Sequence, residues 1–336
     1  MIGSADAGSL DMTIASALQV NGRATWGAIA RALDLPERTV ARRGQRLIDE
    51  GLVRVSTYLD TTIVGHAHPV VVEIHTAPGR AVQVGQILSE RADASSVSVI
   101  EGSGDLTCMI LPRTLEDRAR LLLDEIPSID DVVSVQASTV LRYFRSGYDW
   151  VARELPPEPT AALVQDMIRP AEDAVPAEHL ELEPEDEALV AELAADGRAA
   201  VAQLARSVGL STPTVRRRLD SLFAAGALHV RTEVAPALHG LGLEALIWLR
   251  VRPDRIDDVG RTLGRHPAVR FCVALTGRSQ IMIDCLLLDE AALYAFVTED
   301  IAGLGVDAVD RTGVVLFPLR RGPLLVAPTA VEPVAD

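Results

Sequence analysis

The sequence predicts an α+β protein made of two copies of one unit, each a small helical domain followed by a domain of alternating strands and helices. Three observations predict this class: a repeat of constant spacing, three short helical patterns at the start of each copy, and a downstream alternation of strand and helix periodicities. The 336 residues are 48% hydrophobic and 24% charged, which is typical of a folded globular chain and excludes a disordered one.

The repeat has a shift of 175 residues. Residues 21–24 match residues 196–199, Arg42-Arg43 match Arg217-Arg218, and Gly147 matches Gly322. No insertion is needed over about 125 positions. A register of that length is not expected by chance, so we infer a tandem duplication.

The start of each copy predicts a helix-turn-helix. In the second copy the first helix ends at Asp196-Gly197, Gly209 permits a tight turn, and Ser211 can cap a third helix that Gly226 closes. A short β wing is expected near residues 229–234. Two helices joined by a turn of three or four residues are typical of DNA-binding domains.

The rest of each copy predicts a ferredoxin-like βαββαβ domain, with both helices on one face of an antiparallel sheet. In the second copy we expect strands at 245–251, 269–275, 280–287 and 308–316, and helices at 254–266 and 290–301. The first copy repeats this order between residues 70 and 141.

The expected domains are helix-turn-helix domains at 8–58 and 185–235 and ferredoxin-like domains at 66–148 and 242–325, joined by a linker at 149–184. Residues 151–187 contain eleven acidic residues and two arginines. This stretch also carries six prolines, so we expect most of it to be extended.

The net charge of −15 disfavours nucleic acid, but the local charge of the helical domains does not. Residues 21–55 carry +3 and residues 196–231 carry +4, and every basic residue is an arginine. Guanidinium groups suit phosphates and guanine edges, although such runs are usually solvated helix faces. The predicted DNA-binding residues are Arg38, Thr39, Arg42, Arg43, Ser211, Thr212, Thr214, Arg216, Arg217 and Arg218. Of these, we expect the third helix of the second copy to dominate binding.

This domain order resembles the Lrp/AsnC family of bacterial transcription regulators. The motifs that carry the resemblance are Asp196-Gly197-Arg198, Leu210-Ser211, Arg217-Arg218 and Thr276-Gly277, and it covers nearly the whole chain twice. The resemblance implies sequence-specific binding of double-stranded DNA, dimerisation through the βαββαβ sheets, and regulation by an amino acid or related small molecule. We therefore expect a cytoplasmic homo-oligomer that is not an enzyme, with no metal, no other cofactor and no membrane partner.

In that family a Thr-Gly turn lies near the effector site. The residues that the resemblance assigns to effector binding are Gly102, Ser103, Gly104, Asp105, Thr276, Gly277, Arg278 and Gln280. The first copy has Glu101 in place of Thr276, and Asp105 in place of Gln280, so we expect two non-equivalent sites. A carboxylate at Asp105 could receive an ammonium group.

Two other classes of function stay open. Siroheme decarboxylases, including fused two-copy chains, resemble this architecture, and His75 and His239 would then contact the tetrapyrrole. The wing, however, lacks the Arg-Arg-Phe-Gly-type segment of those enzymes. The other alternative is an effector-binding scaffold that has lost DNA binding.

Metal binding and membrane insertion have weaker support. His66 and His68 have no third ligand nearby, so we expect no metal site there. The three cysteines favour a reducing compartment, and no run of 18 apolar residues occurs.

Two expectations concern how the copies differ and pair. Gly44 stands where the second copy has Leu219, and Trp26 stands where it has Val201. We expect the first helix-turn-helix to be the less stable and the weaker in binding DNA, because a glycine inside a helix and a lost leucine contact both destabilise. Trp26 is expected to fill part of the space that the leucine leaves. The two βαββαβ sheets are expected to pair within one chain.

Overall fold

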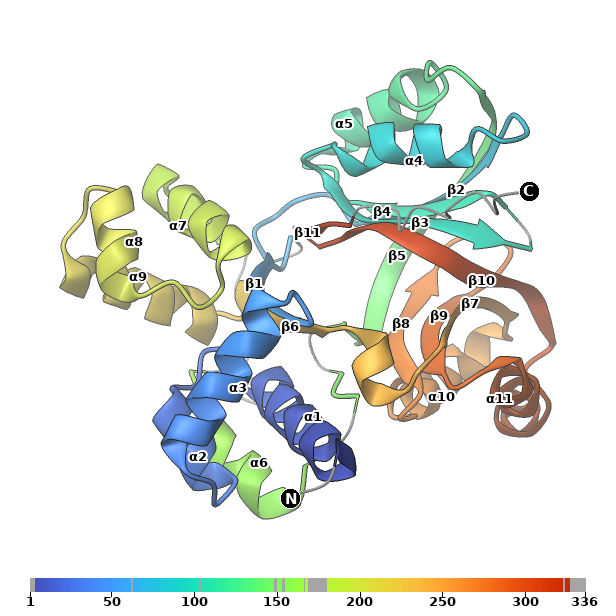
Figure 1. Cartoon of the computed structure of the whole chain (residues 1–336). Helices are drawn as coiled ribbons and strands as arrows, with labels where there is room; N and C mark the ends of the chain where they lie inside the picture. The colour runs from blue at the N-terminus through green and yellow to red at the C-terminus, as the bar shows by residue number, and fades with distance from the viewer. Residues whose placement is uncertain are drawn as a thin grey trace, which may run out of the picture. The chain divides into compact units, whose positions relative to one another are not determined.

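The computed structural model describes residues 4–326 except 62, 103, 148–149, 153–154, 166, 169–179 and 323. The chain forms two compact units, and each contains parts of both copies (Figure 1). One comprises Met1–Gly65 and Arg145–Gly242, and the other comprises His66–Phe144 and Leu243–Asp336. The predicted α+β class, with helix-turn-helix and βαββαβ domains, is confirmed.

The first unit holds both helix-turn-helix domains. Its elements from the first copy are α1 Ser4–Val20, α2 Trp26–Ala32, α3 Glu37–Asp49 and β1 Val53–Leu59. From the second copy come α7 Pro184–Ala195, α8 Val201–Ser207, α9 Thr212–Ala224 and β6 Leu228–Val234. The Ser211 hydroxyl accepts a hydrogen bond from the Thr214 amide, as expected of a helix cap.

Where a β wing is expected, each copy has a single strand, and the two strands form one sheet. Strand β1 pairs with β6 in antiparallel register from Val53–Val234 to Leu59–Leu228. Ser56 and Arg231, which are equivalent in the repeat, face each other at the centre of this ladder. The two helix-turn-helix domains are therefore related by a local two-fold axis.

Part of the expected linker is helical. Helix α6, Pro157–Val164, starts with a proline in its first turn, where the missing N–H costs nothing. Leu163 is buried in the core of the first helix-turn-helix, and its carbonyl accepts a hydrogen bond from Asn21 Nδ2 at 2.8 Å. The expectation of an extended chain is thus wrong for this part, while 169–179 lie outside the described residues.

The second unit contains both βαββαβ domains. The first copy gives β2 Val70–Thr76, α4 Ala81–Ser89, β3 Ala94–Glu101, β4 Leu106–Ile110, α5 Leu115–Arg120 and β5 Val132–Arg145. The second gives β7 Leu243–Arg250, α10 Ile256–Gly264, β8 Val269–Leu275, β9 Ile281–Leu287, α11 Glu290–Ala295 and β10 Ala308–Arg321. A short strand, β11 Leu324–Leu325, follows. Helices α5 and α11 each continue into a π-helical turn, Leu121–Glu125 and Phe296–Ile301.

The two sheets close on each other. The strand order β10-β3-β4-β2-β5-β8-β9-β7 is completed by pairing of β10 with β7. The first half of β10 pairs with β7 of its own copy, and the second half pairs with β3 of the other copy. The expectation that the sheets pair within one chain is confirmed, and this pairing explains why β10 runs beyond the predicted end at residue 316.

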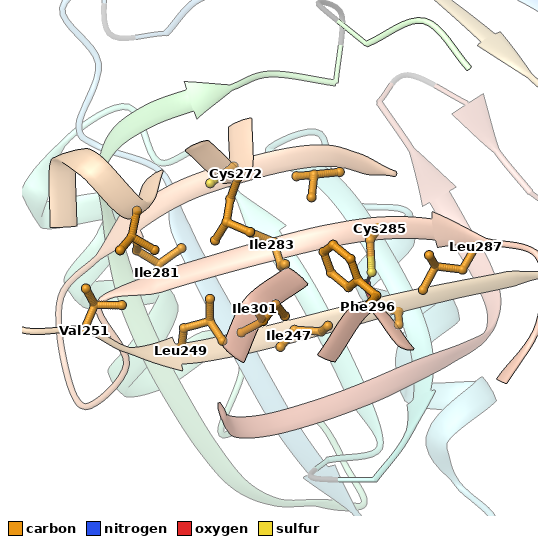
Figure 2. Close-up of a cluster of buried hydrophobic side chains, with 14 of the residues drawn as sticks. Ile247, Leu249, Val251, Cys272, Ile281, Ile283, Cys285, Leu287, Phe296 and Ile301 are labelled. Carbon is orange, nitrogen blue, oxygen red and sulfur yellow. Dashed lines mark hydrogen bonds between the residues drawn. The ribbon is translucent and has the colours of Figure 1, made fainter. Parts of the chain in front are cut away.

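Each sheet packs its helices over an apolar core. Figure 2 shows the cluster of the second copy, where Ile247, Ile283 and Cys285 from the sheet meet Phe296 and Ile301. A separate cluster that includes Trp248, Val71 and Met282 draws on strands of both sheets. Among the described residues, every helix is too short or too polar to cross a membrane.

Candidate nucleic-acid interface

The third helices, α3 and α9, carry arginines whose side chains are exposed. Arg42 of α3 and Arg217 of α9 occupy equivalent positions in the repeat. Arg38 is exposed on α3 and Arg216 on α9, and neither has an arginine at the equivalent position of the other copy. Among the described residues, no side-chain hydrogen bond or ion pair is formed by any of the four. Their charges are therefore available to a ligand in solution.

Arg43 and Arg218 are held differently from their neighbours. Arg43 Nη1 lies 2.9 Å from Asp11 Oδ1, and Arg218 Nη1 lies 3.0 Å from Asp186 Oδ2. Both aspartate side chains are only 11% exposed. These arginines thus join the third helix to the first, a role that the sequence reasoning missed. The signal was available, because Asp11 and Asp186 are also equivalent in the repeat.

The predicted threonines and serine lie near the helix starts. Thr212 and Ser211 are exposed, whereas Thr39 and Thr214 are half-buried. The hydroxyls of Ser211 and Thr214 lie 2.8 Å apart, so both take part in capping α9.

Arg23 and Arg198, from the Asn-Gly-Arg and Asp-Gly-Arg motifs, join the two helix-turn-helix domains. Arg23 Nη1 donates to the Gly197 carbonyl at 2.5 Å, and Arg198 Nη1 donates to the Gly22 carbonyl. Burial lowers the pKa of both guanidinium groups. They still remain protonated, because arginine titrates far above neutral pH. We call Arg23 and Arg198 the reciprocal arginine pair.

The glycines beside this pair are required by close approach. A Cβ on Gly197 would lie 2.8 Å from Ser56 Cα, and one on Gly22 would lie 2.6 Å from Thr232 Oγ1. Each turn therefore fits against the strand of the other copy.

Gly44 faces a filled space. A Cβ on Gly44 would lie 2.4 Å from Trp26 Cζ3, and the guanidinium of Arg198 stacks on the indole ring at 4.3 Å from its centroid. Trp26 therefore occupies the space that a leucine fills in the second copy, which the exchange of Val201 for Trp26 suggested in part.

The predicted effector turns lie between β3 and β4 and between β8 and β9. Asp105 Oδ2 accepts a hydrogen bond from the Thr76 amide at 2.7 Å, and Gln280 Oε1 accepts one from the Val251 amide at 3.1 Å. These positions are equivalent, so both side chains fix the end of the neighbouring strand. Ser103 lies outside the described residues.

Each turn also contacts a strand of the other copy. Thr276 Oγ1 accepts a hydrogen bond from the Thr139 amide of β5 at 2.8 Å. Gly102 has a positive φ of 108°, and a Cβ there would lie 2.5 Å from the Thr312 carbonyl of β10. Gly277, with a φ of 96°, and Gly104 belong to the same turns.

The surroundings of the two turns differ in charge. In the second copy Arg278 Nε lies 3.0 Å from Asp310 Oδ1, and Arg250 Nε lies 3.8 Å from the same atom. In the first copy His75 Nδ1 lies 3.9 Å from Asp105 Oδ2. The second turn thus carries two permanent cations and the first carries none of this kind.

The histidines considered above are spread over the chain. His68 Nδ1 lies 3.0 Å from the Val140 carbonyl. His75 is in the second unit, whereas His239 ends a short 3₁₀ helix, Pro236–His239, in the first. The described residues contain no group of three metal-ligating side chains.

Comparison with protein families identifies the chain. The AsnC-type helix-turn-helix domain matches residues 9–48 and again 185–222, and the Lrp/AsnC ligand binding domain matches residues 244–316. The chain belongs to the Lrp/AsnC family. The two helix-turn-helix matches fall in the two copies of the repeat, which agrees with a tandem-duplicated member of that family.

Relatives of this Lrp/AsnC protein are HTH-type transcriptional regulators. One from Pyrococcus abyssi, described as uncharacterized, is 26% identical over 140 residues, which are 41% of this chain and 89% of the relative. Another, from Mycobacterium tuberculosis, is 29% identical over 148 residues, which are 42% of this chain and 97% of the relative. Each relative is therefore about as long as one copy.

Two solved structures that share the fold over most of this Lrp/AsnC chain are those of an enzyme. The siroheme decarboxylase NirDL has a TM-score of 0.61 at 12% identity, covering 92% of this chain and 93% of that one. Its co-complex with an iron-uroporphyrin III analogue has a TM-score of 0.57 at 14% identity, covering 88% and 87%. This likeness contradicts the expectation that the chain is not an enzyme, because the architecture from which that expectation was drawn is also the architecture of an enzyme.

Proposed function

We propose that this Lrp/AsnC protein is a transcription regulator that binds double-stranded DNA through α3 and α9. The observation that carries the proposal is the equivalent pair Arg42 and Arg217, exposed on helices that the β1–β6 ladder relates by a two-fold axis. Duplex DNA has the same kind of local symmetry, so a reader with two related helices can contact two half-sites.

Charge supports the same proposal. The helix-turn-helix segments are locally basic in an otherwise acidic chain. Arg43 and Arg218 are already neutralised by Asp11 and Asp186, so the exposed arginines carry the charge that faces outward. Such a surface releases counterions when it binds phosphates, and its affinity falls with salt.

A matched pair of substitutions tests the proposal. Arg217→Ala should weaken DNA binding, lower the slope of log affinity against log salt by about one, and leave thermal stability unchanged. Arg218→Ala should instead lower thermal stability, because it leaves the shielded Asp186 carboxylate without its cation, at a cost of about 1–2 kcal/mol. Binding is measured by fluorescence anisotropy on genomic DNA from upstream of the gene.

Arg42→Ala is the corresponding change in the first copy and should also weaken DNA binding, by less than Arg217→Ala, because the third helix of the second copy is expected to dominate binding. Unchanged DNA affinity in both variants, with intact thermal melts, would refute the proposal.

We also propose that a small anionic or zwitterionic effector, such as an amino acid, binds beside the turn of the second copy. Asp105 and Gln280 fix backbone amides, so Arg278, which is 69% exposed, is the better candidate to receive a carboxylate. In a thermal-shift screen with the twenty amino acids, a stabilising ligand should lose most of its effect in Arg278→Ala. An equal shift in this variant would exclude Arg278.

The second candidate function is chemistry on a tetrapyrrole, which the shared architecture with siroheme decarboxylase supports. It is tested by adding iron-uroporphyrin III to the protein and recording the absorbance spectrum. A saturable spectral shift that is lost in His75→Ala or His239→Ala would favour this function, and an unshifted spectrum would count against it.

A further inference from the structure

We propose that one chain reads an asymmetric DNA site in a single orientation, with a shared core in the two half-sites and different flanking bases. This inference rests on the proposed DNA-binding function and specifies its target. It follows from two features of the first unit: the two reading helices are fixed to each other within one chain, and their exposed faces differ.

The fixed geometry comes from contacts that cross between the copies. The β1–β6 ladder is centred on Ser56 and Arg231, and the reciprocal arginine pair bonds the two turns to each other. Gly197 has no room for a side chain against β1. A pair held in this way presents α3 and α9 as one rigid reader, so a single chain supplies both halves.

The exposed faces share a centre and differ around it. Arg42 and Arg217 are equivalent, as are Thr39 and Thr214. Three neighbouring positions differ, with Glu37, Arg38 and Ala41 in α3 standing where α9 has Thr212, Pro213 and Arg216. All but Ala41 among these six are exposed, and Ala41 is half-buried.

These differences change what each helix can recognise. Arg216 offers a planar fork for guanine or phosphate where Ala41 offers only a methyl group. Glu37 can accept a hydrogen bond from a cytosine amino group, but its charge repels phosphates. The Thr212 hydroxyl is uncharged and can both donate and accept, so it can approach a phosphate or either kind of base edge. Each side chain that finds its base is expected to change affinity roughly 5- to 150-fold.

A reader made of two identical chains is matched by a palindrome, because its symmetry is imposed on the site. In this chain only the backbone of the two helix-turn-helix domains follows the two-fold symmetry, while several side chains on α3 and α9 differ. The common residues predict an inverted repeat of a short core, and the differing residues predict that the two flanks are unlike. The chain then has a preferred direction on the DNA.

The test first selects binding sites from a randomised duplex library with the full-length protein and counts chains per site by native mass spectrometry. An iron chelate that cleaves nearby DNA is then attached at Gln45→Cys in α3 or at the equivalent Asp220→Cys in α9. The wild-type chain is the control, since its three cysteines are buried. We expect one chain per site, a non-palindromic consensus, and cleavage of one half-site from each position.

The possible results separate the inference from the function on which it rests. A palindromic consensus, or equal cleavage of both half-sites from each cysteine, would overturn the inference while leaving DNA binding intact. A library in which no sequence is enriched would overturn the DNA-binding proposal, and the inference with it.

Discussion

Gly44 and Trp26 form a complementary pair in the first helix-turn-helix, as Leu219 and Val201 do at the equivalent positions of the second. In the first pair the large side chain sits on the second helix, and in the second pair it sits on the third. The volume between the helices is thus filled from opposite sides. Close-packed interiors tolerate such exchanges when the total volume is kept.

This pairing predicts an unusual response to Gly44→Ala. Alanine in place of glycine normally stabilises a helix by about 1 kcal/mol. Here the added Cβ would lie 2.4 Å from the indole, so we expect a loss of about 1–2 kcal/mol in the free energy of unfolding, measured by urea denaturation. The double variant Gly44→Leu with Trp26→Val should recover most of that loss. A gain in stability for Gly44→Ala would mean that the indole moves aside.

Comparison of the two copies suggested that Trp26 fills part of the space at Gly44, but helical periodicity identifies a buried position without saying how completely another side chain fills it. The same limit applies to Arg218. Its place in a run of basic residues predicts DNA contact, whereas in the structure its guanidinium is bonded to Asp186, 32 residues earlier. In both cases the deciding partner belongs to another helix.

At the scale of elements, periodicity predicts strands and helices but not their partners. Strand β8 has the predicted bounds, residues 269–275, and it ends at the Thr276-Gly277 turn, where Gly277 has a positive φ. Strand β10 runs to Arg321, because its second half pairs with β3 of the other copy. Helix α6 was missed because prolines and acidic residues resemble a linker until a buried leucine anchors them.

The Asp-Gly-Arg turn of the second copy packs closely against β1 of the first, which makes Gly197 sensitive to substitution. Gly197→Ala should lower the melting temperature of the helix-turn-helix unit, because its Cβ would meet backbone atoms of Ser56 that cannot rotate away. We expect a cost of about 2–3 kcal/mol, at the upper end of overpacking. Gly303→Ala is the control, since nothing lies within 4 Å of its Cβ position. Equal melting temperatures for the two variants would contradict the close approach.

At the scale of the whole molecule, the two copies of the repeat pair with each other within one chain. The β1–β6 ladder and the ring of strands each need both copies, so neither unit is complete in a single copy. Any association of whole chains would have to use surfaces outside these pairings.

Because the two copies pair within one chain, we expect the melting temperature not to depend on protein concentration. When two chains must meet to fold, the melting temperature rises with protein concentration. For this chain, we expect the same melting temperature over a hundredfold range of concentration, measured by circular dichroism. A steady rise with concentration would show that pairing between chains stabilises the fold.

The seam between the two sheets contains a buried ion pair that gives the last prediction. Glu73 of β2 lies 2.7 Å from Arg311 of β10, and Arg311 stacks on Trp248 of β7 at 4.9 Å. Burial raises the pKa of Glu73 above its ordinary value, and nearby Asp310 adds to this, while Arg311 and His75 oppose it.

A carboxyl group whose pKa is raised on folding binds its proton more tightly in the folded state. Its contribution to stability is therefore present in full below the pKa of the unfolded chain and is lost as pH rises through the folded pKa. Glu73→Gln removes this titration and keeps an oxygen that can accept from Arg311. The free energy of unfolding of Glu73→Gln relative to wild type should increase between pH 4 and pH 7, measured by urea denaturation with tryptophan fluorescence. The opposite trend would show that attraction to Arg311 outweighs the cost of burying the carboxylate.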